Sequence, residues 1–125
     1  MKKLMIVDDD NNIRLLIKQT LEELEGIDIR EANNAEDALH MVQESKPDLI
    51  LLDVTLPNMN GYQFLEKIKQ SPELESIKIF MITAKAQEKE INIGIGLGAN
   101  LYITKPFDPE YLLINTCEYL NINIE

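Results

Sequence analysis

The 125-residue sequence is poor in cysteine, aromatic residues and positive charge. Its single cysteine, Cys117, excludes a disulfide within the chain, which fits a reducing compartment, and we interpret it as an apolar filler in a terminal helix. The net charge is −10, and no cluster of lysines and arginines offsets it. Because an acidic surface repels phosphodiester backbones, we expect no direct binding of nucleic acid.

Long hydrophobic runs are also missing. The first apolar run, Leu4–Val7, stops after four residues at Asp8–Asp10, which is too short for a signal peptide. A second run, Leu49–Leu52, is too short to span a membrane. Repeats, linkers and low-complexity segments are absent as well. We therefore expect one cytoplasmic domain covering residues 1–125, with no membrane insertion.

The two short apolar runs have in common that each ends in acidic residues. Leu4–Val7 is followed by Asp8–Asp10, and Leu49–Leu52 is followed by Asp53. Such runs suit strands that are covered on both faces, as in a parallel sheet between layers of helices. The carboxyl ends of such strands line the ligand crevice, so Asp53 is the first candidate for chemistry. A lone aspartate at this place could instead only begin a turn or cap a helix.

Apolar runs alternate with helically spaced apolar residues along the rest of the chain. We predict strands at Leu4–Val7, Ile27–Arg30, Asp48–Leu52, Ile77–Ile82 and Leu101–Thr104, with helices starting near Asn11, Asn33 or Asn34, Gly61, Ala86 and Asp108. This alternation predicts an α/β fold, a doubly wound parallel sheet of five strands in a three-layer sandwich. We expect the flavodoxin-like strand order 2-1-3-4-5.

The segment Ile91–Leu97 is ambiguous, because apolar residues alternate there with asparagine and glycine. A strand would form a hairpin with Leu101–Thr104 and break the alternation of elements. We therefore predict a weak helix, in which each interior glycine costs ~1 kcal/mol relative to alanine. The glycines at 94, 96 and 98 are no dinucleotide-binding motif, because they follow no strand and open no helix.

The expected strand order brings five chemically capable residues to one edge of the sheet. Asp8, Asp9 and Asp53 converge if the first and third strands are neighbours, and Thr83 and Lys105 follow the last two strands. Three carboxylates in one crevice repel each other, so either one takes up a proton or a cation is bound. Oxygen ligands without histidine or cysteine favour a hard cation such as Mg²⁺. An ammonium and a hydroxyl beside them suit the stabilisation of a transferred phosphoryl group, with Asp53 as nucleophile.

Each of these residues also has a simpler explanation. Thr83 could cap a helix, Lys105 could be an ordinary ion-pair partner of the acids, and Asp8–Asp10 could cap the first helix, which we expect for Asp10. Five such residues on consecutive strand ends are nevertheless hard to explain as independent accidents.

The chain resembles the receiver domain of two-component response regulators. The resemblance covers essentially the whole chain, in order, and rests on Ile6-Val7-Asp8-Asp9, Leu51-Leu52-Asp53, Pro57, Gly61, Thr83-Ala84, and Tyr102 with Lys105-Pro106-Phe107. It implies that Asp53 accepts a phosphoryl group from the phosphohistidine of a histidine kinase or phosphotransfer protein, or from a small phosphodonor. It further implies that Asp9 and Asp53, with the Thr55 carbonyl, bind Mg²⁺, while Asp8 acts largely through water.

The resemblance also assigns the other residues. Lys105 would pair with the phosphoryl group, and Thr83 would hydrogen-bond it and draw Tyr102 inward. The Lys105-Pro106 bond would be cis. Phosphorylation and dephosphorylation would be self-catalysed, and output would pass to a downstream target protein through the face of the fourth helix, fifth strand and last helix. The protein would be a monomer or a phosphorylation-dependent dimer.

Two departures from the family pattern stand out. Leu56 replaces a frequent methionine, and the glycine-rich Ile93–Gly98 replaces an alanine-rich fourth helix. We predict an unusually mobile output face, with Ile93 and Leu97 as possible apolar contacts. In the family, the residues at Thr55 and Lys85 modulate the lifetime of the phosphoryl group.

Two other functions remain open. A haloacid-dehalogenase-like phosphatase would use Asp8 as its nucleophile, but Asn12 stands where that family has threonine or valine, and Asp53 would be idle. A protein-interaction module that is never phosphorylated would keep the fold without needing the acids, Thr83 and Lys105.

Overall fold

The computed structural model describes residues 1–123 of the chain. Its strands are β1 (Lys2–Val7), β2 (Ile27–Ala32), β3 (Leu49–Leu52), β4 (Lys78–Thr83) and β5 (Leu101–Thr104). Its helices are α1 (Asn11–Leu21), α2 (Ala35–Glu44), α3 (Gly61–Gln70), α4 (Glu88–Gly96) and α5 (Pro109–Leu120). Strands and helices alternate strictly, as the sequence predicts.

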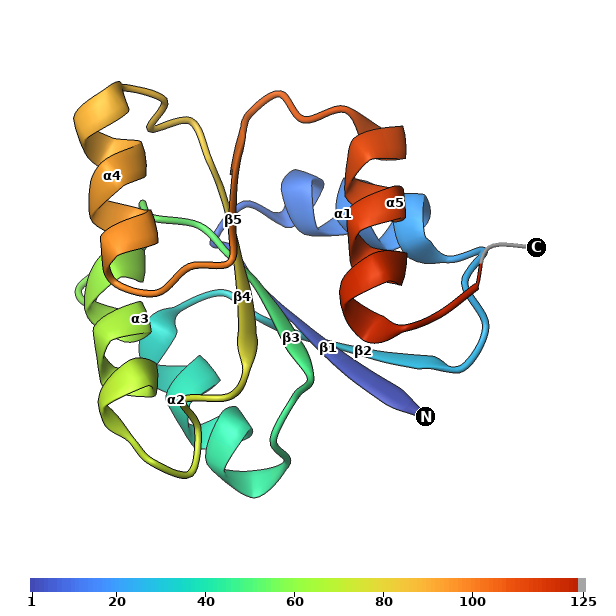
Figure 1. Cartoon of the computed structure of the whole chain (residues 1–125), viewed down its shortest axis with the longest axis horizontal. Coiled ribbons are helices and arrows are strands. Elements are labelled where there is room, and N and C mark those ends of the chain that lie inside the picture. The colour runs from blue at the N-terminus through green and yellow to red at the C-terminus, as the bar shows by residue number, and fades with distance from the viewer. Residues whose placement is uncertain (124–125) are drawn as a thin grey trace.

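The five strands form one parallel sheet in the order β2-β1-β3-β4-β5. Helices α1 and α5 cover one face of this sheet, and α2, α3 and α4 cover the other (Figure 1). The predicted fold class, strand order and three layers are therefore confirmed. The segment whose pattern was ambiguous is helical, since α4 runs from Glu88 to Gly96.

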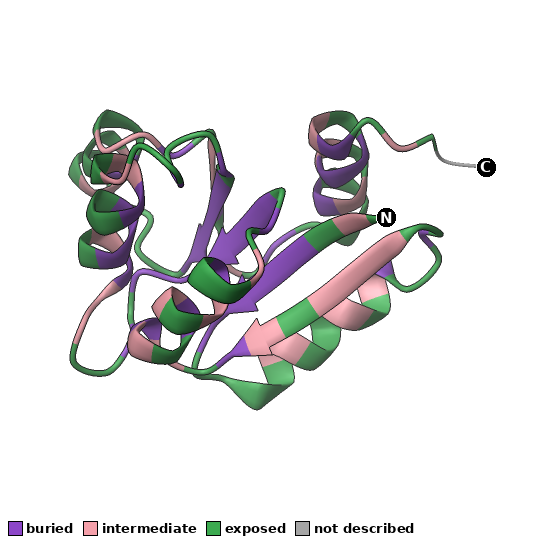
Figure 2. Cartoon of the chain, turned by 90° about the horizontal axis from the view of Figure 1, so that it is seen from below, coloured by how far each residue is buried: buried purple, intermediate pink, exposed green. Residues whose placement is uncertain are grey.

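Alternating side chains of the central strands form two separate cores. Met5, Val7, Ile50 and Leu52 point toward α2 and α3, whereas their neighbours in sequence, such as Leu51, point toward α1 and α5. Strand β3 is buried along its whole length and β1 is buried from Leu4 onward, whereas the edge strand β2 is more exposed (Figure 2). Burial on both faces explains why β3 is a continuous apolar run.

Several element boundaries differ from the predicted ones by one to five residues. Helix α1 ends at Leu21, before the predicted stop at Gly26, and β2 continues to Ala32 rather than ending at Arg30. The extension of β2 arises from its pairing with β1, in which Val7 lies opposite Ala32. Within residues 1–123, we find no helix that is both long enough and apolar enough to cross a membrane.

Candidate functional site

Three carboxylates meet at the carboxyl ends of β1 and β3. These strands are neighbours with Val7 opposite Leu52, so Asp8 and Asp53 leave the sheet side by side. One carboxylate oxygen from each of Asp8, Asp9 and Asp53 lies within 4.8 Å of the others. Asp8 and Asp53 are buried, whereas Asp9 is exposed. The sequence prediction that these three acids converge is confirmed.

Lys105 connects the acids to the far edge of the sheet. It follows β5, and its Nζ donates to Asp8 Oδ2 at 2.9 Å and to Asp53 Oδ2 at 3.0 Å. Burial disfavours its charge, but the hydrogen bonds and charges of the two carboxylates outweigh this and raise the pKa of Lys105. The ammonium therefore stays charged between the two buried acids. The expected cis Lys105-Pro106 bond is present.

The loops after β1 and β3 fix the acids through backbone amides. Asp10 N donates to Asp8 Oδ1 at 2.9 Å, and Thr55 N donates to Asp53 Oδ1 at 3.2 Å. The Asp10 side chain accepts from Asn12 N at 2.8 Å and caps α1, as predicted. Each buried acid thus has one oxygen held by its own loop and the other held by Lys105.

Gly61, the first residue of α3, allows the loop after β3 to close. Its N donates to Val54 O at 2.8 Å, and a Cβ built on it would lie 2.1 Å from Asp53 O. Only glycine fits where two backbone segments approach so closely. The short return from β3 to α3 therefore depends on this position.

The charge balance of the site favours a cation. Burial raises the pKa of Asp8, and the nearby Asp53 charge acts in the same direction, against the hydrogen bonds from Asp10 N and Lys105. One ammonium faces three carboxylates in this cluster. The donor set consists of carboxylate oxygens only, which suits a hard divalent ion.

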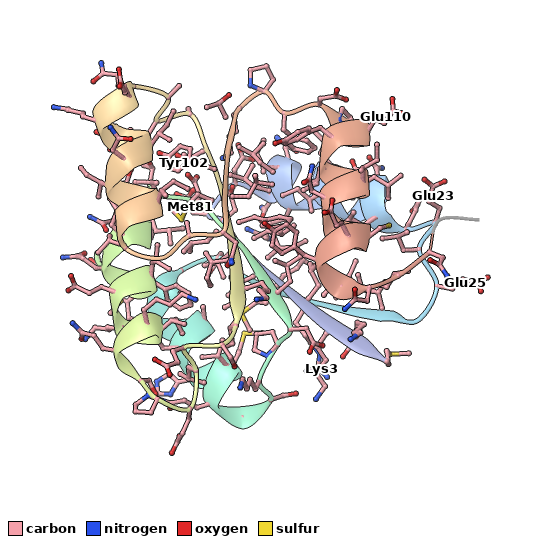
Figure 3. The ribbon with its side chains drawn as sticks, viewed as in Figure 1. Lys3, Glu23, Glu25, Met81, Tyr102 and Glu110 are labelled. Carbon is pink, nitrogen blue, oxygen red and sulfur yellow. The ribbon has the colours of Figure 1, made fainter. Side chains whose placement is uncertain are left out.

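Thr83 and Tyr102 lie beside the acids on the α4 side of the sheet. Thr83 ends β4 and is fully buried, and its Oγ1 accepts from Lys85 N at 3.3 Å. Tyr102 belongs to β5, and its side chain lies between this strand and α4 (Figure 3). Its hydroxyl donates to Lys85 O at 2.7 Å. The two residues that the sequence analysis linked are therefore connected through one residue of the β4–α4 loop.

The sequence profile of the response regulator receiver domain matches residues 4–116. The chain belongs to this family. The receiver domain is 40% identical over 108 residues to the alkaline phosphatase synthesis transcriptional regulatory protein PhoP of Bacillus subtilis, covering 86% of this chain and 44% of the relative. It is 40% identical over 112 residues to the phosphate regulon transcriptional regulatory protein PhoB of Pseudomonas aeruginosa, covering 90% and 48%. It thus spans about half the length of these relatives.

Solved structures give the same result. A response regulator of Chloroflexus aurantiacus superposes with a TM-score of 0.89 at 32% identity, over 96% of this chain and 98% of the other. The chemotaxis protein CheY4 of Vibrio cholerae superposes with a TM-score of 0.86 at 30% identity, over 96% and 99%. The receiver fold therefore accounts for nearly the whole chain.

Two residues near the site were missed by the sequence analysis. Arg14 on α1 donates to Asp8 O at 2.6 Å, pairs with Glu31 at 2.9 Å and contacts the Asn11 side chain. Hydrogen bonds from Lys18 and Arg14 lower the pKa of Glu31 despite its burial. Arg14 lies one turn into a helix, and that helix directly follows Asp8–Asp10. This position could have indicated the contact between Arg14 and Asp8. The second residue, Tyr62 on α3, gave no such signal, because its partners lie on α4 and β5.

Proposed function

We propose that this receiver domain accepts a phosphoryl group on Asp53 with the help of Mg²⁺. The observation that carries the proposal is the placement of Lys105 Nζ, within 3.0 Å of both Asp8 and Asp53, beside a cluster of three carboxylates. The donor would be a phosphohistidine of a histidine kinase or phosphotransfer protein, or a small acyl phosphate. The reaction would be self-catalysed by the receiver, as would the later hydrolysis.

The acids fit a magnesium site. Asp9 and Asp53 would bind the ion with the backbone carbonyl of Thr55, and Asp8 would act largely through water. When bound, Mg²⁺ supplies positive charge that offsets the oxygens of the transferred group. Carboxylates within 4.8 Å of one another support this assignment.

The protein side chains would perform the transfer as follows. An Asp53 carboxylate oxygen forms a bond to phosphorus while the phosphorus–nitrogen bond of the donor breaks, and the electron pair stays on the departing imidazole. Lys105, already at 3.0 Å from Asp53, would turn its ammonium to the phosphoryl oxygens. Thr83 would donate its hydroxyl to another of them and draw the β4–α4 loop toward the site.

Output would pass to a downstream target protein through α4, β5 and α5. Three apolar side chains on α4 and α5 support this face: Ile93, Ile95 and Ile114 are each about half exposed, at 46%, 47% and 47%. Leu97, which the sequence analysis also suggested as a contact, instead packs partly against the core. On this proposal the domain would work as a monomer or as a dimer formed on phosphorylation, in the cytoplasm.

The phosphatase with Asp8 as nucleophile is not favoured by the family match. Asp8 and Asp53 are held alike, each with one carboxylate oxygen accepting from its own loop and the other accepting from Lys105. Asp53 also faces Lys105 and lies beside the metal-binding acids, so it is not idle as that alternative requires.

The test is to trap the acyl phosphate. The protein is incubated with Mg²⁺ and acetyl phosphate, reduced with borohydride, and mapped by mass spectrometry in the wild type, Asp53→Asn and Asp8→Asn. We expect modification of residue 53 in the wild type and its loss in Asp53→Asn, whereas Asp8→Asn lowers the yield without moving the position. A label at Asp8 with steady turnover of substrate would support the phosphatase, and no label at all would support a module that is not phosphorylated.

A further inference from the structure

Two tyrosine hydroxyls meet between α3, α4 and β5. Tyr62 from α3 and Tyr102 from β5 both pack against the core, and their hydroxyl oxygens are 3.1 Å apart. The Tyr62 hydroxyl also lies 2.9 Å from Glu90 O and 2.9 Å from Glu90 Oε2, in the first turn of α4. Tyr62 therefore contacts both Tyr102 and α4. Tyr102 is the residue that Thr83 would draw inward on phosphorylation, and we call this pair of residues the switch.

Each of the two hydroxyls also has a shorter contact outside the pair. Each phenol has one proton. The Tyr102 hydroxyl donates to Lys85 O at 2.7 Å, and the Tyr62 hydroxyl donates to Glu90 at 2.9 Å. Across the 3.1 Å between the two hydroxyl oxygens, either phenol can be the donor. Burial, the bond to Tyr102 and the Glu90 carboxylate raise the pKa of Tyr62, so the phenol keeps its proton.

These contacts continue to the candidate site. Lys85 accepts the Tyr102 proton with its carbonyl and donates its own N–H to Thr83 Oγ1 at 3.3 Å. A series of polar contacts thus runs from Thr83 through Lys85 and Tyr102 to Tyr62 and Glu90. Its ends are a buried site residue and the start of α4.

Gly94 provides the space in which Tyr102 lies. It is the buried residue of α4, and a Cβ at this position would be 2.9 Å from two atoms of the Tyr102 ring and 3.6 Å from the Tyr62 ring. A Cβ on Gly96, by contrast, would have no atom within 4 Å. One of the glycines of this helix is therefore required by the tyrosine pair and not by the helix itself.

We infer that Tyr62 is a positioning residue of the switch, which holds Tyr102 packed against Gly94 and joins it to α4 through Glu90. The inference rests on the proposed function, since the packed position of Tyr102 is the one coupled to Thr83. Removing the Tyr62 hydroxyl then weakens the binding of every ligand that requires Thr83 and Tyr102 in this arrangement. A phosphoryl analogue is such a ligand.

The experiment is a double-mutant cycle with Tyr62→Phe and Tyr102→Phe, read as the affinity for beryllofluoride in the presence of Mg²⁺. We expect Tyr62→Phe to weaken binding about five-fold, the effect of one neutral hydrogen bond. In the Tyr102→Phe background the same change has a smaller effect, because its partner is gone. Tyr111→Phe, which removes an exposed phenol from α5, is the matched control and leaves the affinity unchanged.

A second measurement, amide hydrogen exchange of Glu90–Gly94 in the free protein, needs no phosphoryl chemistry. We expect faster exchange in Tyr62→Phe than in the wild type or Tyr111→Phe. Wild-type affinity in Tyr62→Phe, or an equal loss in both backgrounds of the cycle, would overturn the inference. If the wild type binds no beryllofluoride, the proposed function fails, and unchanged exchange in Tyr62→Phe would then overturn the role of Tyr62 separately.

Discussion

Helices α3 and α4 lie in the same layer of the protein but are held in different ways. Helix α3 buries Gly61, Phe64, Leu65 and Ile68 against the sheet, and a capping box of Asn60 and Gln63 closes its first turn. Helix α4 has Gly94 as its buried residue, and its N-cap, Gln87, makes no side-chain hydrogen bond. Figure 1 shows the two helices on the same face of the sheet, with α4 above α3.

The difference teaches where this fold is rigid. Helix α3 starts immediately behind Asp53, since its first residue lies against Asp53 O, and the four buried positions anchor it. Helix α4 is linked to the site through tyrosine hydroxyls and the Lys85 carbonyl rather than by buried apolar side chains. Contacts of that kind are few and can be exchanged, so α4 is the element suited to move.

The strongest way to break the comparison is Gly61→Ala. The added Cβ would lie 2.1 Å from a backbone oxygen that cannot move without moving Asp53. We expect a loss of about 3 kcal/mol in the free energy of unfolding, measured by urea denaturation. A loss below about 1 kcal/mol would show that the α3 junction is looser than described.

The sheet and the strand ends that hold the acids could largely be predicted from the sequence. The run Leu49–Leu52 ending in Asp53 has the pattern of a strand that is covered on both faces. Lys105-Pro106 marks the end of β5, and Asp108-Pro109 marks the start of α5. Local pattern and tertiary structure agree there because burial on both faces admits only apolar residues. The placement of Asp8 beside Asp53 followed from the strand order alone.

The tyrosine network could not be predicted in the same way. Glu90 and Tyr102 are 28 and 40 positions away from Tyr62 in the sequence, and their meeting depends on how closely α3 and α4 pack. In the sequence, a glycine in a helix indicates only a lower helix propensity. In the structure, the absence of a side chain at Gly94 leaves room for the Tyr102 ring. Long-range packing of this kind leaves no periodic signal.

Gly94→Ala sharpens the comparison from the α4 side. The methyl group would displace the Tyr102 ring, so we expect the protein to lose about 1–2 kcal/mol of stability despite the better helix propensity of alanine. Gly96→Ala is the matched control, because its Cβ meets nothing within 4 Å, and it should stabilise the protein slightly. Equal gains in both variants, measured by thermal unfolding, would mean that Tyr102 does not need this space.

Amide hydrogen exchange compares the two helices without any substitution. We expect the amides in the middle of α4 to exchange about ten times faster than those of α3, because α3 is anchored by four buried residues. This measurement also tests the prediction of a mobile output face. Protection of α4 equal to that of α1 or α3 would refute it.

The helix caps give the smallest expected difference. The Asn60 side chain accepts from Gln63 N at 2.9 Å, so Asn60→Ala should cost about 1 kcal/mol. Gln87→Ala, at the equivalent position of α4, should cost close to nothing, because Gln87 makes no cap hydrogen bond. Similar losses in both variants, from denaturant titrations, would remove this part of the contrast.

The central claim, that the strand-end acids form a magnesium-dependent phosphoryl site, is tested most directly by titrating the protein with Mg²⁺ in a calorimeter. The wild type should bind one ion per chain, and Asp53→Asn should lose this binding. Asp48→Asn, at the opposite end of β3 where its carboxylate accepts from Lys3 N, should bind as the wild type does. Magnesium binding that survives in Asp53→Asn, or a wild type that binds no ion, would contradict the account.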